Sequence, residues 1–156
     1  MHKPLAAMSL ALLLAACASA EVTRTSANTM IINADAEASC GASGAAKVAS
    51  KTAAIETIRA GYDRYMIVDS RASNNVQTYT LPGQYQTSGA MDRYGNYYEK
   101  TTYIPGATQT TGSYDNSVSV VMFRPGDEGY QNALDARSQL GPEWQKLVRD
   151  GINSCL

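Results

Sequence analysis

The run Ser117-Val-Ser-Val-Val-Met-Phe123 is the most apolar stretch after residue 20 and predicts a β-strand. Valine favours strands because branched side chains pack well on a pleated surface. Two further runs of this kind, Thr29-Met-Ile-Ile-Asn33 and Tyr65-Met-Ile-Val-Asp69, predict two more strands. The 65–69 run starts apolar on both faces, so we expect it in the centre of the sheet. Alternation resumes over residues 76–80, so this strand is expected to continue or bend near residues 74–75.

A helix is predicted between the first two of these strands, over residues 45–60. Apolar and small side chains recur there at three- and four-residue steps on one narrow face, formed by Ala45, Val48, Ala49, Thr52, Ile55 and Ile58. Ser39 and Ser43 are candidate N-cap residues. Gly61 is suited to end the helix, because glycine adopts the left-handed conformation without steric cost. The alanine content predicts close packing of this helix on a sheet.

Two helices are predicted after the third strand. Arg124-Pro-Gly-Asp127 is interpreted as a turn, and Asp127 can cap a helix over residues 128–139. Pro142 suits a first helical position, and a second helix follows over residues 143–150. The residues expected to face the core from this last helix are Trp144, Leu147 and Val148.

These elements predict an α+β fold, a small two-layer sandwich with helices on one face of a short sheet. The expected order is β-α-β, then an insertion rich in Tyr and Gly, then β-α-α, with a right-handed crossover between the first two strands. Residues 29–156 are expected to form a single domain, with the insertion at 82–117 at an edge of the sheet. The length of the chain leaves room for one domain.

Residues 82–117 have an unusual composition, rich in Gly, Ser, Thr, Gln, Asn and Tyr. One interpretation is a long, partly ordered insertion with a hairpin around Tyr94-Gly-Asn-Tyr97. The other is a binding surface, because tyrosine offers flat amphipathic contact area at little cost in conformational entropy. The candidate binding residues are Tyr85, Tyr94, Tyr97, Tyr98 and Tyr103.

The first twenty residues have the pattern of an export signal. A weakly basic start is followed by the apolar run 5–14, which is too short to span a membrane but typical of a secretory signal. The next residues, Leu14-Ala15-Ala16-Cys17, resemble the lipobox of bacterial lipoproteins in both position and spacing. That resemblance implies a signal peptide over residues 1–16 and acyl chains on Cys17. Residues 17–28 are then expected to form a polar, lipidated tether.

Two questions about processing stay open in the sequence. Ala18-Ser19-Ala20 also fits an ordinary signal-peptidase site, and cleavage there would release a soluble secreted or periplasmic protein beginning at Glu21. In well-studied Gram-negative lipoproteins, an aspartate directly after the lipidated cysteine retains the protein at the inner membrane. If Cys17 is lipidated, this position is occupied by Ala18. The resemblance therefore implies a small Gram-negative envelope lipoprotein anchored to the outer membrane and facing the periplasm.

The two remaining cysteines are Cys40 and Cys155. Two cysteines in an exported chain are most often paired, because the compartment is oxidising. The bond would close a loop that contains most of the chain. In the chain-entropy model, closing such a loop stabilises the folded state by about 4.7 kcal/mol. A redox or metal pair is the alternative, but there is no C-x-x-C motif and no histidine nearby. We therefore expect a structural disulfide.

The sequence offers few catalytic groups. Its one histidine is His2, inside the expected signal, so Ser-His-Asp and Cys-His catalysis and histidine-based metal sites have no imidazole. We expect no cofactor and no metal. With 13 Lys and Arg against 14 Asp and Glu, we also expect no nucleic-acid binding. The acidic residues that could supply a carboxylate pair are Asp63, Asp69, Asp92, Asp115, Asp127 and Glu128.

Two functions from different classes follow from these observations. The first is a non-enzymatic lipoprotein that binds, senses or structurally supports an envelope protein or glycan through the tyrosine-rich segment. The second is a hydrolase of envelope glycans, which would need two carboxylates facing each other across a groove. A secreted soluble protein is a third, minor possibility.

Overall fold

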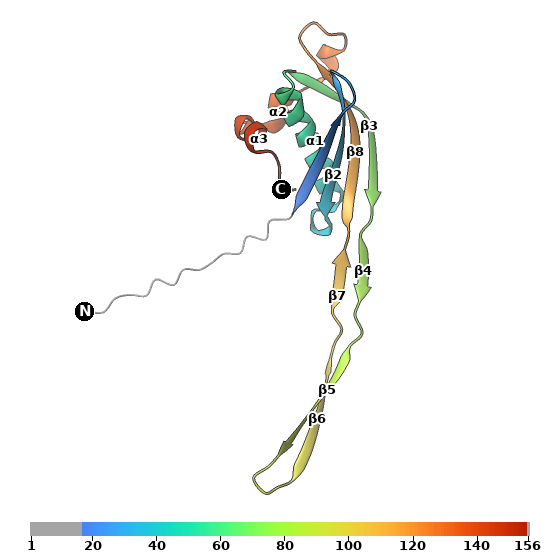
Figure 1. Ribbon diagram of the computed structural model, residues 1–156, viewed down its shortest axis with the longest axis vertical. Helices are drawn as coiled ribbons and strands as arrows, with labels where there is room; N and C mark the ends of the chain where they lie inside the picture. The colour runs from blue at the N-terminus through green and yellow to red at the C-terminus, as the bar shows by residue number, and fades with distance from the viewer. Residues whose placement is uncertain (1–16, 156) are drawn as a thin grey trace, which may run out of the picture.

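The computed structural model describes residues 17–155, which form a compact body and a long ribbon that projects from it (Figure 1). The body contains mixed helix and sheet, so the broad α+β expectation is confirmed. Its sheet has five antiparallel strands in the order β1-β2-β8-β3-β9. Their bounds are β1 Ala18–Arg24, β2 Thr29–Glu37, β3 Arg64–Asn74, β8 Ser113–Phe123 and β9 Leu134–Asp135.

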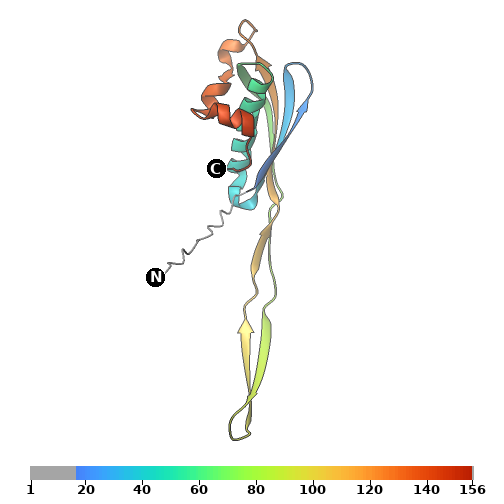
Figure 2. The ribbon, with the colours of Figure 1, turned by 60° about the vertical axis from the view of Figure 1, so that its left-hand side comes forward.

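The helices of the body lie on one face of the sheet, and the other face is uncovered (Figure 2). They are α1 Gly41–Arg59, α2 Ala136–Leu140 and α3 Trp144–Asp150, with short 3₁₀ turns at η1 Ala38–Cys40 and η2 Tyr130–Asn132. None of the helices within residues 17–155 has the length and apolar character needed to cross a bilayer.

β8 is the central strand. Its core-facing residues Asn116, Val118, Val120 and Met122 are buried, and the residues between them turn towards the uncovered face. The expectation that the 65–69 strand would be central is wrong. β3 is buried only at Tyr65, and all of its residues after the register shift between Ile67 and Asp69 are exposed. β9, its outer neighbour, covers only two of its residues.

α1 is confirmed over the predicted residues and begins four residues earlier, at Gly41. Its buried face includes Val48, Ala49, Ala53 and Ile55, which pack on the core side of the sheet. The small alanines let the helix backbone approach the strands closely, which keeps the core dense. The expected serine caps are wrong, because the N-cap is Cys40 and no side chain caps this helix.

Gly61 follows the end of α1 at φ +78°. Its N–H donates to the Ile58 carbonyl, and the following Tyr62 N–H donates to the Thr57 carbonyl. Glycine is favoured at this position because a side chain would strain the left-handed backbone. The predicted end of the helix is therefore confirmed.

The predicted helix over 128–139 is wrong in its first half. The chain forms η2, then extends at Ala133 to pair with β3 as β9. Asp135 caps the short helix α2 by accepting from the Ser138 N–H at 2.8 Å. Asp127 instead accepts from the Arg124 N–H and closes the turn after β8. Sheet pairing at Arg64 replaces the helical hydrogen bonds that a continuous helix would have made.

The last predicted helix, over 143–150, is confirmed as α3. Trp144, Leu147 and Val148 pack against the core, as expected from their spacing. The Arg137 guanidinium lies over the Trp144 ring, 5.3 Å from its centroid. This contact links α2 to α3 above the end of α1.

The expected tether over residues 17–28 is also wrong. Residues 18–24 form β1, which pairs with β2 along its whole length. Ala18, Ala20 and Val22 are the half-buried residues that turn towards the core. A polar strand can occupy this place because an edge strand keeps one side in solvent. The expected signal peptide, residues 1–16, lies outside the described residues.

Candidate functional site

The segment expected as an edge insertion is a two-stranded ribbon that continues β3 and β8 beyond the body (Figure 1). β4 Gln77–Thr80 pairs with β7 Thr108–Thr111, and further out β5 Gln84–Met91 pairs with β6 Tyr97–Ile104. The edge position is therefore wrong, because the ribbon leaves from the end of the inner strands. The predicted hairpin around residues 94–97 is confirmed, since the chain reverses between Met91 and Tyr97.

A joint divides the ribbon where Pro82 lies near Pro105 on the other strand. Proline has no N–H to give to a strand ladder, so the pairing is interrupted between β4–β7 and β5–β6. One backbone hydrogen bond, from the Leu81 N–H to the Ala107 carbonyl at 2.9 Å, remains at this place.

Three tyrosines form one face of the outer ribbon, which we call the tyrosine face: Tyr85, Tyr97 and Tyr103, together with Met91. The register places Tyr85 opposite Tyr103 and Met91 opposite Tyr97, so all four side chains point the same way. The Tyr85 and Tyr103 ring centroids are 5.0 Å apart, with their planes tilted by 49°. Tyr85 is 76% exposed, so these rings are open to solvent.

Two glycines lie beneath rings of the tyrosine face. A Cβ at Gly83 would meet the Tyr103 ring, and a Cβ at Gly89 would meet the Tyr97 ring. Each ring therefore covers the backbone of a glycine on the opposite strand. The contact with the glycine restricts the position of the ring, while the ring stays exposed. The result is an ordered aromatic surface that is open to solvent.

The other two predicted tyrosines lie elsewhere. Tyr98 is opposite Ala90 on the reverse face of the ribbon, and Tyr94 is in the turn at its tip. Tyr79 on β4 was not among the predicted residues, and its hydroxyl donates to the Gln109 side chain at 2.6 Å. The sequence did contain a pattern that could have indicated Tyr79, because this residue falls within the alternation over residues 76–80.

Asp92 organises the tip of the ribbon. Its carboxylate accepts from the Asn96 side chain at 2.9 Å and from the Tyr94 and Asn96 backbone N–H groups. The Asn96 side chain, followed by these backbone donors, lowers the pKa of Asp92. A carboxylate bound in this way fixes the turn, so Asp92 has a structural role.

A second cluster lies where the ribbon leaves the body, and we call it the root. Asp115 accepts hydrogen bonds there from Ser113 at 2.7 Å, from Ser73 at 3.2 Å and from Asn75. Asp35 of β2 is directly opposite Asp115 on the uncovered face, and each carboxyl influences the pKa of the other. Asp115 therefore ties both strands of the ribbon to the sheet.

The two root carboxyls have opposite pKa shifts. Burial, and then the hydrogen bond and charge of Asp115, raise the pKa of Asp35, and Glu21 adds to the effect. Hydrogen bonds, first from Ser113, lower the pKa of Asp115. The pKa of Asp35 therefore lies above that of Asp115. The sequence does not predict this pair, because only the register of β2 on β8 brings the two residues together.

Three of the carboxylates proposed for glycan hydrolysis, Asp63, Asp69 and Asp115, have structural partners. Asp63 is paired with Arg137 at 3.0 Å and Asp69 with Arg71 at 3.3 Å. Asp115 accepts hydrogen bonds from Ser113, Ser73 and Asn75 at the root. Within residues 17–155, no group of three His, Cys, Asp or Glu residues could hold a metal ion.

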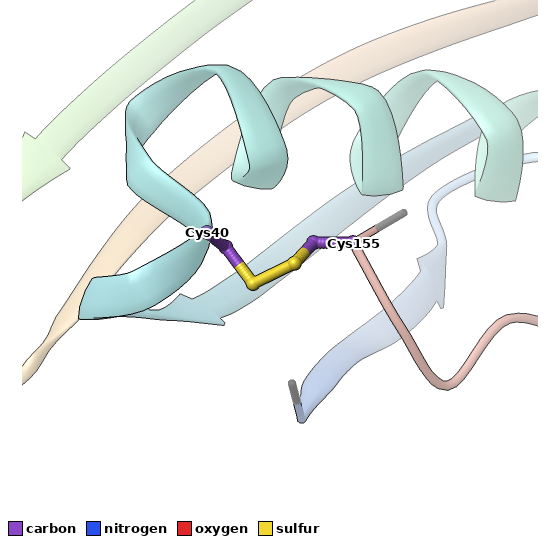
Figure 3. The surroundings of a disulfide bond; sticks show 2 residues. All are labelled: Cys40 and Cys155. Atoms are coloured by element: carbon purple, nitrogen blue, oxygen red, sulfur yellow. A yellow bond between two sulfur atoms is a disulfide. The ribbon is translucent and has the colours of Figure 1, made fainter. Parts of the chain in front are cut away.

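The disulfide between Cys40 and Cys155 is present, as the sequence predicts (Figure 3). It joins the start of α1 to the C-terminal segment. That segment also contacts the start of β1, because the Ala18 N–H donates to the Asn153 carbonyl and Cys17 forms a β-bridge with Ser154. The disulfide therefore fixes the part of the body that surrounds Cys17.

Comparisons with known proteins add no relative: no family model, curated protein or solved structure matches this chain. The candidate site therefore rests on its own geometry. Its two parts are the exposed ribbon and the hydrogen-bonded root that holds it.

Proposed function

We propose that this chain is a lipid-anchored protein of the bacterial envelope that contacts another envelope component through its ribbon. The observation that carries the proposal is the ribbon itself, in which every residue of β4, β5, β6 and β7 is exposed. A two-stranded hairpin is marginally stable alone in water. The ribbon adds nothing to the buried core of the body, so a binding role is the simplest reason for its length.

Two observations support export and the anchor. A structural disulfide is typical of exported proteins, because the cytosol keeps thiols reduced. The second is the extent of β1. Cleavage after Ala20 would remove Cys17 and the first three residues of β1, and with them two backbone hydrogen bonds that start the sheet. Cleavage before Cys17 keeps the strand whole, which favours the lipobox over the soluble alternative.

The intact mass of the purified protein tests the anchor. We expect a chain that begins at Cys17 and carries acyl chains, and a membrane fraction that contains it. The matched control is Cys17→Ala, which is expected to leave the membrane fraction. A chain that begins at Glu21 or at Met1 would contradict the anchor.

Photo-crosslinking in living cells tests the ribbon. A benzophenone amino acid at position 85, on the tyrosine face, is expected to give an adduct with an envelope component. The control is the same amino acid at position 134, because Leu134 of the body is also exposed, at 45%. Equal yields at the two positions, or no adduct at position 85, would contradict binding through the ribbon.

A further inference from the structure

We infer that the envelope component is the membrane surface itself: the ribbon lies along the bilayer that holds Cys17, with its tyrosine face in the headgroup layer. The inference rests on the proposed anchor at Cys17 and names the partner of the ribbon. It follows from the position of Cys17 relative to the root, from the length of the ribbon and from its chemistry.

Cys17 belongs to the body and is not separated from it by a tether. Its carbonyl accepts from the Glu37 N–H at 3.3 Å, and it forms a bridge with Ser154. Cys17 also lines one pocket together with Gly112 and Ser113, where the returning strand of the ribbon enters β8. An acyl anchor on Cys17 therefore holds the end of the body from which the ribbon projects (Figure 1).

The ribbon is long compared with the membrane beside which the anchor would hold its root. From Val76 to the tip at Asp92 it spans roughly 50–60 Å, at about 3.3 Å per residue. The hydrocarbon layer of a bilayer is about 30 Å thick. A ribbon that meets the bilayer from the anchored end therefore has two positions: along the surface, or within the bilayer.

The hydrocarbon interior is excluded by the polar groups of the ribbon. Both outer edges of the β5–β6 pair carry backbone N–H and C=O groups without a neighbouring strand. Such groups find no partner in hydrocarbon, where each costs several kcal/mol. Glu99 and Lys100 add two charges in the middle of β6. A ribbon that meets the bilayer is therefore expected to stay at its surface.

The composition of the ribbon suits the headgroup layer. Tyrosine is enriched at this depth because its ring is apolar and its hydroxyl is wet. Exposed Met91, on the same face, adds apolar contact area. The charges between residues 75 and 112 are Asp92, Arg93, Glu99 and Lys100, which cancel. The contact is therefore expected to depend little on anionic lipid or on salt.

Depth-dependent quenching in reconstituted vesicles tests the inference. The full lipidated protein carries Tyr85→Trp in a Trp144→Phe background, in vesicles of phosphatidylethanolamine with a quarter of phosphatidylglycerol. Bromine placed near the headgroups is expected to remove about half of the emission of the introduced tryptophan, and bromine deep in the chains less. The matched control is Leu134→Trp in the same background. Its tryptophan emission is expected to stay unchanged with bromine at either depth.

Each other outcome overturns the inference in a distinct way. If bromine does not change the emission of the Tyr85→Trp protein, the ribbon is away from the bilayer, while the anchor still holds the protein to the vesicles. Stronger quenching by deep bromine, with release of a trapped dye, would show that the ribbon crosses the membrane. Protein that does not associate with vesicles at all would contradict the anchor and so the proposed function.

A second measurement needs no change at Trp144. Hydrogen exchange of the unmodified lipidated protein is compared in vesicles and in detergent. The amides of residues 84–104 are expected to exchange several-fold more slowly in vesicles, while those of α1 stay unchanged. Equal exchange of the ribbon in the two environments would overturn the inference.

Discussion

Gly44 lies in the first turn of α1, at a position where an alanine side chain does not fit. A Cβ there would lie 2.7 Å from the Cys40 Cβ and 3.1 Å from the Cys155 Cβ. Alanine normally stabilises a helix relative to glycine by about 1 kcal/mol. Overpacking costs about 1–3 kcal/mol, and neither Cβ can move without its backbone. We therefore expect Gly44→Ala to lower the free energy of unfolding.

Urea unfolding measures this change at Gly44. The control is Ser43→Ala, at the neighbouring exposed position of the same turn, which is expected to change the stability little. A Gly44→Ala protein as stable as the unmodified one would show that the disulfide has room to shift.

The carboxyl pair at the root predicts a pH dependence. The pKa of Asp35 is raised above its ordinary value of 3.8. The folded protein therefore keeps a proton that the unfolded chain releases, and the contribution of Asp35 to stability falls as the pH rises through its folded-state pKa. Asp35→Asn removes this loss, and its amide can still donate to Asp115. We expect a gain of up to about 1 kcal/mol near neutral pH, since the site is largely exposed.

Chemical unfolding at neutral pH and at about pH 3 checks this prediction, because the gain should shrink where Asp35 is protonated in both states. Asp115 has the opposite sign: its pKa is lowered, so its contribution is lost as the pH falls through its folded-state pKa. Glu37→Gln removes a charge from the same strand and is the control. A less stable Asp35→Asn protein at neutral pH would contradict the raised pKa of Asp35.

At the scale of elements, the disulfide connects the C-terminal segment, α1 and the start of β1. We expect Cys40→Ser with Cys155→Ser to lower the free energy of unfolding by about 2–4 kcal/mol, because the open chain has more conformations to lose on folding. Thermal unfolding with and without reductant measures it. The unmodified protein in reductant should match the double variant, and a reductant effect on the double variant itself would point to another cause.

At the scale of the whole molecule, the body should fold without the ribbon. The Asn75 N–H donates to the Ser113 carbonyl, so replacing residues 76–112 by Asn-Gly joins two paired residues with a two-residue hairpin turn. We expect an unfolding free energy within about 1 kcal/mol of the full chain, because the removed strands are exposed and carry no core residue.

Calorimetry and circular dichroism of the excised protein test this independence. The control keeps the full ribbon and changes Tyr85→Ser with Tyr103→Ser, which should be equally stable. Loss of cooperative unfolding on excision would show that the ribbon supports the sheet, and would remove the argument that it exists for binding.

Patterns within short segments of the sequence were enough to predict several elements. The runs at 29–33, 65–69 and 117–123 are strands, and residues 45–59 lie in α1, because alternation and helical spacing are local properties. The disulfide followed from cysteine count and the expected export. The hairpin at the tip followed from Tyr94-Gly-Asn-Tyr97, whose residues favour a turn.

The tertiary structure alone decided which segments pair across long distances in the chain. Residues 18–24 are too polar to indicate a strand, and they become β1 because β2 offers an open edge. Residues 134–135 leave the helical pattern because β3 is beside them. The tyrosine face and the Asp35–Asp115 pair likewise depend on register, which a local pattern does not contain because it is fixed by partners far away in the sequence.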